Sequence, residues 1–400
     1  MPRSDGGTYE MASDFERRRF IKAASAAGLI GLAGCSGGPS DGENSSDGSD
    51  GGDGSDGMDG DDGGDGSDGE DGSDGDDGGS GPAANVGMVY ATGGLGDGSF
   101  NDQAQQGAIQ AEEELGIAFR ESQPDEVAQF STFQQQFAES DDPNYDLVCC
   151  IGFLQADSLS DTASSYPDQD FMIVDSVVES DNVASYVFQE HEGSYLAGLM
   201  ASLLTTRSFS AGAGSTSGDS TNLGFVGGVE SDLIQKFQAG FEAGVSAGND
   251  DVDVSVNYTG SFNDPAAGRE AANAMYNSGA DIVYHAAGNT GTGVFQAAQE
   301  QERFAIGVDR DQSVTRPEYS DVILGSMVKR VDTAVFNAIE ATVNDEFAGG
   351  SSVALGLESN GVELVYGDQL GSEIPQDVLD EVSTARDSII AGDTDVPSEL

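Results

Sequence analysis

Basic side chains are scarce in this sequence, and their scarcity excludes one large class of partners. The 400 residues hold 15 lysines and arginines against 72 acidic residues, and the lysines number three, at Lys22, Lys236 and Lys329. A protein that binds nucleic acid needs a basic surface to neutralise phosphates. The composition therefore argues against nucleic acid as a partner.

Histidine is scarce as well, which limits the chemistry open to the chain. His191 and His285 are the two histidines, too few for most metal sites. The sequence contains neither the His-Glu-x-x-His pattern of zinc proteases nor the Gly-x-x-x-x-Gly-Lys pattern of phosphate-binding loops. We therefore expect no metal, no other cofactor and no catalytic activity.

Cysteine occurs three times, and two of the three are adjacent. Cys149 and Cys150 lie in an apolar run from Leu147 to Phe153, which predicts two buried cysteines on a strand. The alternative is a disulfide between the two neighbours, which forms only with strain.

The third cysteine closes a segment that is typical of an export signal. Arg17–Lys22 is basic, Ala23–Ala33 is apolar, and Leu32-Ala33-Gly34-Cys35 follows. The paired arginines resemble a twin-arginine signal, and the last four residues resemble the lipobox of exported lipoproteins. The apolar stretch is shorter than the roughly 20 residues that span a bilayer. We expect residues 1–34 to be cleaved and Cys35 to carry lipid at the extracellular face of the cell membrane; the alternative is an uncut N-terminal anchor.

The segment that follows Cys35 consists mostly of Asp, Gly and Ser. Residues 41–79 hold 16 acidic residues and no lysine or arginine. Such a segment cannot bury enough apolar surface to offset the entropy of ordering it, and its like charges extend it. We predict that residues 35–84 form a disordered linker. A calcium-binding tract is the alternative, although the spacing and closing Glu of a calcium loop are missing.

The acidic excess extends beyond this linker. Of the 72 acidic residues, 56 lie outside residues 41–79, and the net charge is −57. An acidic surface with few lysines suits concentrated salt, since the Debye length falls to about 3 Å at molar ionic strength. At low salt the same charges would repel one another and destabilise the compact state. The composition therefore indicates a halophilic protein.

From residue 85 onward, apolar runs alternate with amphipathic stretches. The runs predict strands at Val86–Tyr90, Leu147–Ile151, Phe171–Val174, Ala184–Phe188, Leu223–Val226, Val252–Tyr258, Ile282–His285, Ala305–Val308 and Val322–Ser326. The amphipathic stretches predict helices at Asp102–Leu115, Ser158–Ser165, Gly193–Thr206, Asp232–Ala247, Pro265–Ser278, Thr292–Glu302, Arg330–Asn344 and Gln376–Ile390. This alternation indicates an α/β protein with parallel sheets flanked by helices. In such sheets the ligand lies beyond the carboxyl ends of the strands.

A series of motifs in this region resembles one known family. The first is Gly93–Asn101, in which paired glycines precede Asp-x-Ser-Phe-Asn. The others follow in order at Gly152-Phe153, Ala156-Asp157, Asp175, Glu192–Gly198, Gly227-Gly228, Phe237–Gly244, Gly260–Pro265, Ala287–Phe295, Gly307–Gln312 and Ser326–Asp332. The ordered set covers nearly all of residues 85–367. It resembles the basic membrane protein family of purine nucleoside receptor-like lipoproteins, here of haloarchaeal type.

The resemblance implies a fold and a function. The fold is the two-lobed, periplasmic-binding-protein-like fold of type I, with the ligand cleft between the lobes. The function is that of a lipid-anchored substrate-binding protein that binds nucleosides, purine ones above all, and delivers them to the permease and ATPase subunits of an ABC importer.

The resemblance also assigns residues to the ligand. Phe100 and Phe262 resemble the aromatic pair that sandwiches the base, and Asp175 resembles the carboxylate at the base edge. Asp309 and Lys329 resemble the residues that hold the ribose. Gly288 would line the floor of the site, and Asn101 would lie beside Phe100. Near the end of the first strand the chain has Ala91-Thr92 where family members often carry an acidic or amide residue, so the base preference stays open.

The expected domain limits follow the motifs and the predicted elements. We expect a bilobed domain over residues 85–367 and a C-terminal helix and tail over 368–400. Lobe 1 would consist mainly of residues 85–205 and 280–310, and lobe 2 mainly of residues 222–280 and 310–367. The Ser- and Gly-rich stretch Ser208–Thr221 is either a boundary between the lobes or a surface insertion.

Two other functions remain open from the sequence. A surface receptor that senses another small solute without transporting it would need the same anchor and the same cleft. An α/β chain with acidic residues at its strand ends could also be a hydrolase that acts on nucleosides.

Overall fold

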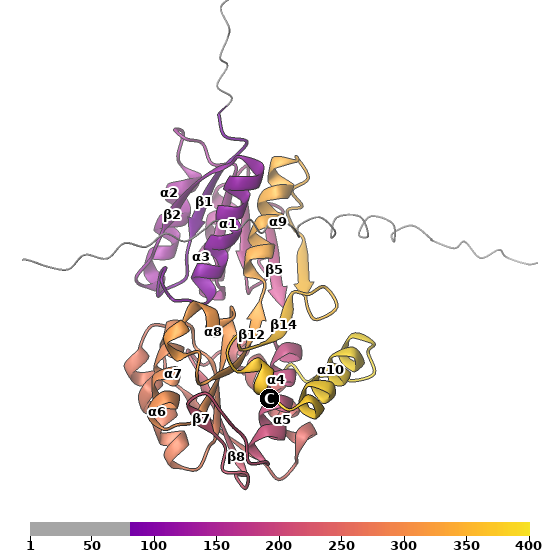
Figure 1. Ribbon diagram of the computed structural model, residues 1–400. Helices are drawn as coiled ribbons and strands as arrows, with labels where there is room; N and C mark the ends of the chain where they lie inside the picture. Colours follow the sequence, from indigo (N-terminus) through magenta and orange to yellow (C-terminus); the bar gives the residue numbers. More distant parts are fainter. Residues whose placement is uncertain (1–80) are drawn as a thin grey trace, which may run out of the picture. The chain divides into compact units, whose positions relative to one another are not determined.

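The computed structural model describes residues 81–400 and contains two parallel-stranded sheets, one in each lobe (Figure 1). The predicted signal, the lipidation site Cys35 and the linker up to residue 80 lie outside the described residues. The first sheet is parallel throughout, in the order β13-β5-β4-β3-β1-β2. Its strands are β1 (Asn85–Val89), β2 (Ala118–Ser122), β3 (Leu147–Ile151), β4 (Asp170–Val174), β5 (Val183–Phe188) and β13 (Ser352–Leu355).

The second sheet has the order β14-β12-β11-β10-β8-β9 and is parallel except at its β14 edge, where β14 runs antiparallel to β12. Its strands are β8 (Asn222–Gly227), β9 (Asp253–Tyr258), β10 (Ile282–Ala286), β11 (Phe304–Asp309), β12 (Ile323–Lys329) and β14 (Val362–Tyr366). The predicted α/β class with parallel sheets flanked by helices is confirmed.

Helices cover both faces of each sheet. Those of the first lobe are α1 (Phe100–Leu115), α2 (Phe130–Ala138), α3 (Ala156–Ser165) and α9 (Val331–Val343), and α1 packs beside α9. Those of the second lobe are α4 (Glu190–Thr205), α5 (Asp232–Gly248), α6 (Pro265–Asn277), α7 (Gly291–Glu300), α8 (Gln312–Thr315) and α10 (Gln376–Ile390). Short 3-10 helices lie at Val127–Gln129, Phe153–Gln155, Gly288–Thr290, Pro317–Tyr319 and Gly371–Glu373. Figure 1 shows α10 against α4 in the second lobe.

The ends of several helices follow from local sequence. Ser231 begins α5 and accepts a hydrogen bond from the amide of Ile234 at 3.4 Å, and Asp264 caps α6 in the same way, just before Pro265. Gly116 ends α1 with a left-handed φ of 72°, a conformation that glycine adopts without steric cost.

The central strands are buried on both faces, as expected for parallel sheets. All five residues of β3 are buried, including Cys149 and Cys150, which are both free thiols. The prediction of two buried strand cysteines is confirmed, and the pair is not bridged.

The chain passes between the lobes three times within residues 81–400. It crosses from β5 to α4, from β12 to α9 and from β13 to β14. The crossing segments are hydrogen-bonded to one another: the amide of Gln189 donates to Leu355 O, and that of Arg330 donates to Gly361 O, both at 2.9 Å.

These crossings correct the expected division into lobes. Residues 280–310 were assigned to lobe 1, but β10 and β11 pair with β8 and β12 in the second sheet. Helix α4, expected in lobe 1, packs on α5, and α9, expected in lobe 2, packs on α1. The reason is that each crossing is a few residues long, so that neighbouring elements in the sequence fall in different lobes.

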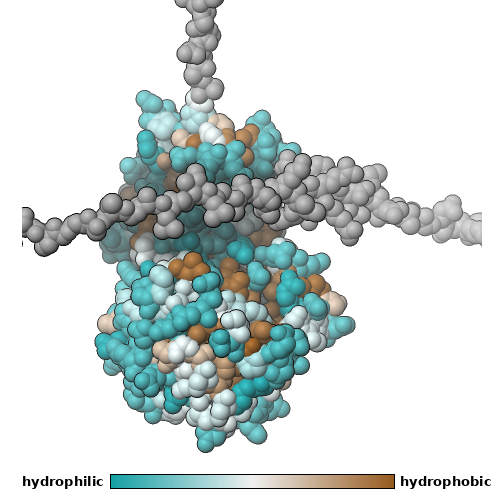
Figure 2. Space-filling view, viewed as in Figure 1, coloured by the Kyte–Doolittle hydropathy of each residue, from teal (hydrophilic) through white to brown (hydrophobic). Residues whose placement is uncertain are grey.

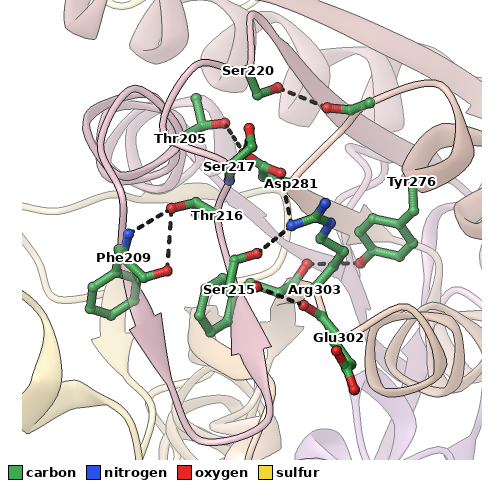
Figure 3. Close-up of polar contacts among 12 residues, drawn as sticks. Thr205, Phe209, Ser215, Thr216, Ser217, Ser220, Tyr276, Asp281, Glu302 and Arg303 are labelled. Carbon is green, nitrogen blue, oxygen red and sulfur yellow. Dashed lines mark hydrogen bonds and ion pairs between the residues drawn. The ribbon is translucent and has the colours of Figure 1, made fainter.

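The stretch Ser208–Thr221 is a surface insertion of the second lobe. It forms a hairpin of β6 (Ser210–Ala211) and β7 (Gly214–Ser215). Figure 3 shows how the stretch is fixed to the lobe: the buried carboxylate of Asp281 accepts from Thr205 and Ser217 and lies 3.3 Å from the guanidinium of Arg303. This ion pair lies at the amino end of β10, where it fixes the hairpin segment to the second lobe; we call it the hairpin clasp.

The surface of the second lobe that is visible in Figure 2 is mostly hydrophilic, with scattered apolar residues. Within residues 81–400, no helix is both long enough and apolar enough to cross a membrane.

Candidate functional site

A pocket lies between the two lobes, at the carboxyl ends of strands from both sheets. About 70 Å³ of it can hold the centre of a water-sized sphere, and the empty space totals about 700 Å³ when the open mouth is counted. Loops after β1, β3 and β4 line it from the first lobe, and residues after β10 and at the ends of β11 and β12 line it from the second. The structure brings all seven predicted ligand residues to this pocket: Phe100, Asn101, Asp175, Phe262, Gly288, Asp309 and Lys329.

The Gly-rich loop before α1 is held by carboxylates and an amide. Asp97 accepts from the amides of Ser99 and Asn101 at 2.9 Å each, and Asp102 accepts from the amides of Gly96 and Gly98. Gly96 and Gly98 have φ values of 87° and 61°, which favour glycine. This loop places Phe100 at the start of α1 and at the pocket.

Asn101 is buried, and its side chain is used by the same loop. Its Oδ1 accepts from the amide of Ala91 at 2.9 Å, and its Nδ2 donates to the carbonyl of Gly94 at 3.0 Å. The structure therefore gives Asn101 a local task, which is to join the end of β1 to the loop that carries Phe100.

The pocket is walled by aromatic rings from both lobes. Besides Phe100 and Phe262, the lining contains Phe153 and Phe237. The ring of Phe153 lies edge-on to that of Phe262, with centroids 6.4 Å apart. Gly228 leaves room for Phe262, because a Cβ there would lie 2.3 Å from the ring. The sequence motifs contained Phe153 and Phe237, but neither had been predicted as a ligand residue.

A buried ion pair lies at the inner wall of the pocket. The Nζ of Lys329 is 2.7 Å from Oδ2 of Asp175, and the two side chains are 2% and 3% exposed. Oδ1 of Asp175 has no hydrogen-bond partner among the described residues. Burial raises the pKa of Asp175. Burial alone would lower the pKa of Lys329, but the carboxylates of Asp175, Glu190 and Asp309 outweigh it and raise that pKa.

Asp309 provides a second carboxylate from the other lobe. It ends β11, is 5% exposed and accepts a hydrogen bond from the hydroxyl of Ser99. Burial raises the pKa of Asp309 to about 6, although Lys329 and the Ser99 hydroxyl act in the opposite direction. The carboxylate therefore titrates near neutral pH.

Further polar contacts join the two lobes beside the pocket mouth. The hydroxyl of Thr315 donates to the carbonyl of Gly98, and Nη2 of Arg316 donates to the carbonyl of Gly96, both at 2.9 Å. Together with the contact between Ser99 and Asp309, they connect the loop before α1 to the segment around α8.

Glu190 lies behind Lys329 and was not predicted. It follows β5 at the first crossing and is completely buried. Its Oε1 lies 3.5 Å from Lys329, and its Oε2 lies 3.0 Å from Lys236. No spacing in the sequence indicates such contacts, because they join residues that are far apart in the chain.

The arrangement is suited to holding a flat, uncharged ligand that carries hydroxyl groups. Aromatic rings offer stacking faces, carboxylates accept from hydroxyls, and an ammonium donates to them. Among residues 81–400, no group of three or more His, Cys, Asp and Glu side chains could hold a metal ion.

Comparison with known proteins finds relatives that match nearly all of the described residues. The family described as ABC transporter substrate-binding protein PnrA-like matches residues 84–397. A CD4+ T-cell-stimulating antigen of Listeria innocua is 35% identical over 333 residues, covering 78% of this chain and 88% of its own length. The ABC transporter nucleoside-binding protein BmpA of Lactococcus lactis is 33% identical, with the same coverage of both chains.

Solved structures agree on the fold. The crystal structure of an ABC transporter solute-binding protein from Aeropyrum pernix K1 superposes with a TM-score of 0.70 at 29% identity, over 79% of this chain and 94% of that one. A solute-binding protein from Conexibacter woesei superposes with a TM-score of 0.61 at 21% identity, over 79% and 99%.

Proposed function

Because this chain belongs to the PnrA-like family of ABC transporter substrate-binding proteins, we propose that it binds nucleosides, purine nucleosides in particular, in the pocket between its lobes. The family consists of binding proteins and not of enzymes. Such proteins bind a solute and work with a permease and an ATPase. The nucleoside-binding relative from Lactococcus lactis supports this choice of ligand.

One observation carries the proposal: the pocket combines aromatic walls with a carboxylate and an ammonium that reach it from different strand ends. A nucleoside is uncharged, so it needs stacking faces and a few polar partners. Stacking of one base on an aromatic ring contributes about 1–3 kcal/mol. Adjacent ribose hydroxyls can donate to Asp309 and accept from Lys329.

The other residues take complementary roles in this proposal. Phe100 and Phe262 stack on the base, and Asp175 accepts from its edge through Oδ1, which has no partner among the described residues. Gly288 lines the floor, where a side chain would approach the carbonyl of Phe262. Asn101 supports Phe100 through the loop.

The proposal extends to how the protein is delivered and where it works. The twin-arginine signal over residues 1–34 would export the chain, lipid on Cys35 would tether it to the extracellular face of the membrane, and the acidic linker would separate the binding domain from the bilayer. Mass spectrometry of the membrane fraction tests this part: a chain that still begins at Met1 and carries no lipid would contradict it.

Titration calorimetry in molar salt tests the ligand. Wild type is titrated with adenosine, guanosine, inosine, the pyrimidine nucleosides and the corresponding free bases. Asp309→Ala should weaken ribonucleosides much more than free bases, and Phe100→Ala should weaken all bases alike, by about 1–3 kcal/mol. A wild type that binds none of these compounds but binds another solute would refute the proposed ligand.

A further inference from the structure

The ammonium of Lys329 is held in a closed environment. Three aromatic rings surround it, with centroids 4.8 Å away for Phe100, 5.4 Å for Phe188 and 5.5 Å for Phe237. Asp175 approaches it from the first lobe at 2.7 Å, and Glu190 approaches it from the first crossing at 3.5 Å. Two carboxylates on different elements therefore attract this ammonium and determine its position.

Glu190 is the less expected of the two carboxylates. Its side chain is 0% exposed, and Oε1 has no hydrogen-bond partner among the described residues. A buried carboxylate is costly unless it is paired and hydrogen-bonded. Its pairing comes from two ammonium groups, those of Lys329 and Lys236, and the Lys236 ammonium also donates to the carbonyl of Phe188 at 3.1 Å.

Asp175 and Lys329 line the pocket. Among the described residues, Glu190 and Lys236 lie behind Lys329 and do not line the pocket. We propose that Glu190, fixed by Lys236, is a positioning residue that holds the Lys329 ammonium where it can donate to the sugar of a ligand and so favours nucleosides over free bases. The statement about sugar rests on the proposed function, whereas the statement about the position of Lys329 does not.

Two substitutions should change the attraction between Glu190 and Lys329 in opposite directions. Glu190→Gln leaves one acceptor for two ammonium groups, because an amide presents an NH2 group in place of the second oxygen. Lys329 keeps its contact with Asp175, already 2.7 Å long, and loses the opposing attraction of Glu190. Lys236→Met leaves Lys329 as the one cation paired with Glu190 among residues 81–400, which should draw the ammonium away from Asp175. The Lys236 side chain is 24% exposed, so this second variant perturbs the core less.

A buried ion pair elsewhere provides the matched control. Asp281 is 1% exposed and pairs with Arg303 in the hairpin clasp of Figure 3. Asp281→Asn removes a buried carboxylate charge of the same kind at the opposite end of β10, so it reports the effect of lost stability without any effect on Lys329.

The first readout needs no ligand. The full chain contains three lysines, at Lys22, Lys236 and Lys329, so NMR spectra of lysine-labelled protein are simple, and the Lys236→Met spectrum assigns Lys236. The surrounding rings make the Lys329 side-chain shift sensitive to small displacements. We expect this signal to move in Glu190→Gln and in Lys236→Met and to stay in place in Asp281→Asn.

The second readout is the ratio of affinities for guanosine and guanine, and for adenosine and adenine. Both test variants should bind the nucleoside about tenfold more weakly, as expected when a charged hydrogen bond is lost, and the free base within about twofold of wild type. Asp281→Asn should leave the ratio unchanged even if it lowers the melting temperature.

The outcomes separate the two claims. A Lys329 signal that stays in place in the test variants overturns the proposal, as does a signal that moves while the ratio is unchanged, or a ratio that changes equally in Asp281→Asn. If Glu190→Gln does not fold, Lys236→Met decides alone. If wild type ignores nucleosides but the Lys329 signal moves as expected, the proposed ligand is rejected and the positioning of Lys329 by Glu190 is supported.

Discussion

At the scale of single residues, Asp175 and Asp309 share an uncommon backbone conformation. Their φ values are 70° and 65°, in the left-handed region that Asp tolerates better than most residues with a Cβ. Each stands at the end of a strand and at the pocket. We infer that this backbone conformation turns both carboxylates toward the space between the lobes.

The raised pKa of Asp309 predicts pH-dependent binding. Burial raises this pKa to about 6, so the carboxylate is protonated progressively as the pH falls from 7 to 5. The neutral acid loses the charge-assisted hydrogen bond to a sugar hydroxyl. We expect nucleoside affinity to fall across this window in calorimetry at several pH values, and the affinity of Asp309→Asn to be low and nearly flat over the same range.

The same titration has the opposite sign for the stability of the free protein. The pKa of Asp309 is higher in the folded state than in the unfolded state, so its contribution is fully stabilising below the unfolded pKa of about 4 and is lost as the pH rises through 6. Acid therefore favours the folded free protein through this group while it weakens binding. A wild-type affinity that rises as the pH falls from 7 to 5 would contradict the assignment of Asp309 to the sugar.

The residues in and behind the pocket differ in how far the sequence could predict them. Phe100, Asp175 and Asp309 follow strands or begin a helix, and they lie in motifs that resemble a known family. Glu190 and Lys236 act on Lys329 through tertiary contacts, which no local spacing indicates. Residues that line the pocket at strand ends were therefore predictable, and the residues behind them were not.

At the scale of elements, α4 and α5 pack with very little space between their backbones. A Cβ added at Gly198 would lie 2.1 Å from the carbonyl oxygen of Phe241, and one added at Gly244 would lie 2.0 Å from that of Tyr195. The two helices can therefore approach each other only where one of them carries glycine, and the α4–α5 pair joins the first crossing to the second lobe.

Gly244→Ala should separate these helices and destabilise the protein. Inserting one methyl group into such a contact costs about 1–3 kcal/mol, so we expect a lower melting temperature in wild-type salt. Ser246→Ala, on the exposed side of the same helix, is the control; it removes one exposed hydrogen bond to Asp250 and should change stability by less than about 0.5 kcal/mol. Equal melting temperatures for Gly244→Ala and wild type would mean that the helices tolerate a wider spacing.

Most strands that the sequence predicted correctly are buried, and the partly exposed edge strand β9 is the exception. β3 is a continuous apolar run and β10 is apolar except for His285, and their predicted limits agree with the structure to within two residues. Among the missed strands, β2, β13 and β14 lie at sheet edges and are partly exposed, so their patterns are weak, and β6 and β7 are two residues long each. Helix α2 was missed because glutamines surround its phenylalanines.

Membership of a lobe was not predictable, because a crossing segment has no pattern of its own.

At the scale of the whole molecule, the contacts between the lobes should determine how long a ligand stays bound. Arg316 lies outside the described pocket lining but donates to Gly96 of the other lobe. Arg316→Ala should remove about 1 kcal/mol of interlobe contact and speed nucleoside release about fivefold in stopped-flow measurements. Arg269→Ala, which breaks an exposed ion pair with Glu300 inside the second lobe, is the control. An unchanged release rate in Arg316→Ala would show that this contact does not limit opening.

The charge of the described chain is the last feature at this scale. Residues 81–400 hold 52 acidic and 10 basic residues. Several of the basic residues are already paired, among them Lys236, Lys329 and Arg303. Most of the carboxylates therefore repel one another across a surface that is largely hydrophilic where Figure 2 shows it, and mobile ions are the remaining source of screening.

We propose on this basis that folding requires salt. The Debye length grows from about 3 Å at 1 M to about 30 Å at 0.01 M, so dilution restores repulsion between carboxylates and destabilises the compact state. Circular dichroism should show the melting temperature falling steadily as sodium chloride is lowered from molar to tens of millimolar, with loss of structure at the lower end. Sucrose at low salt is the control, because it favours burial by exclusion from the surface but does not screen charge. Full recovery in sucrose, or a melting temperature independent of salt, would show that charge repulsion is not what limits folding.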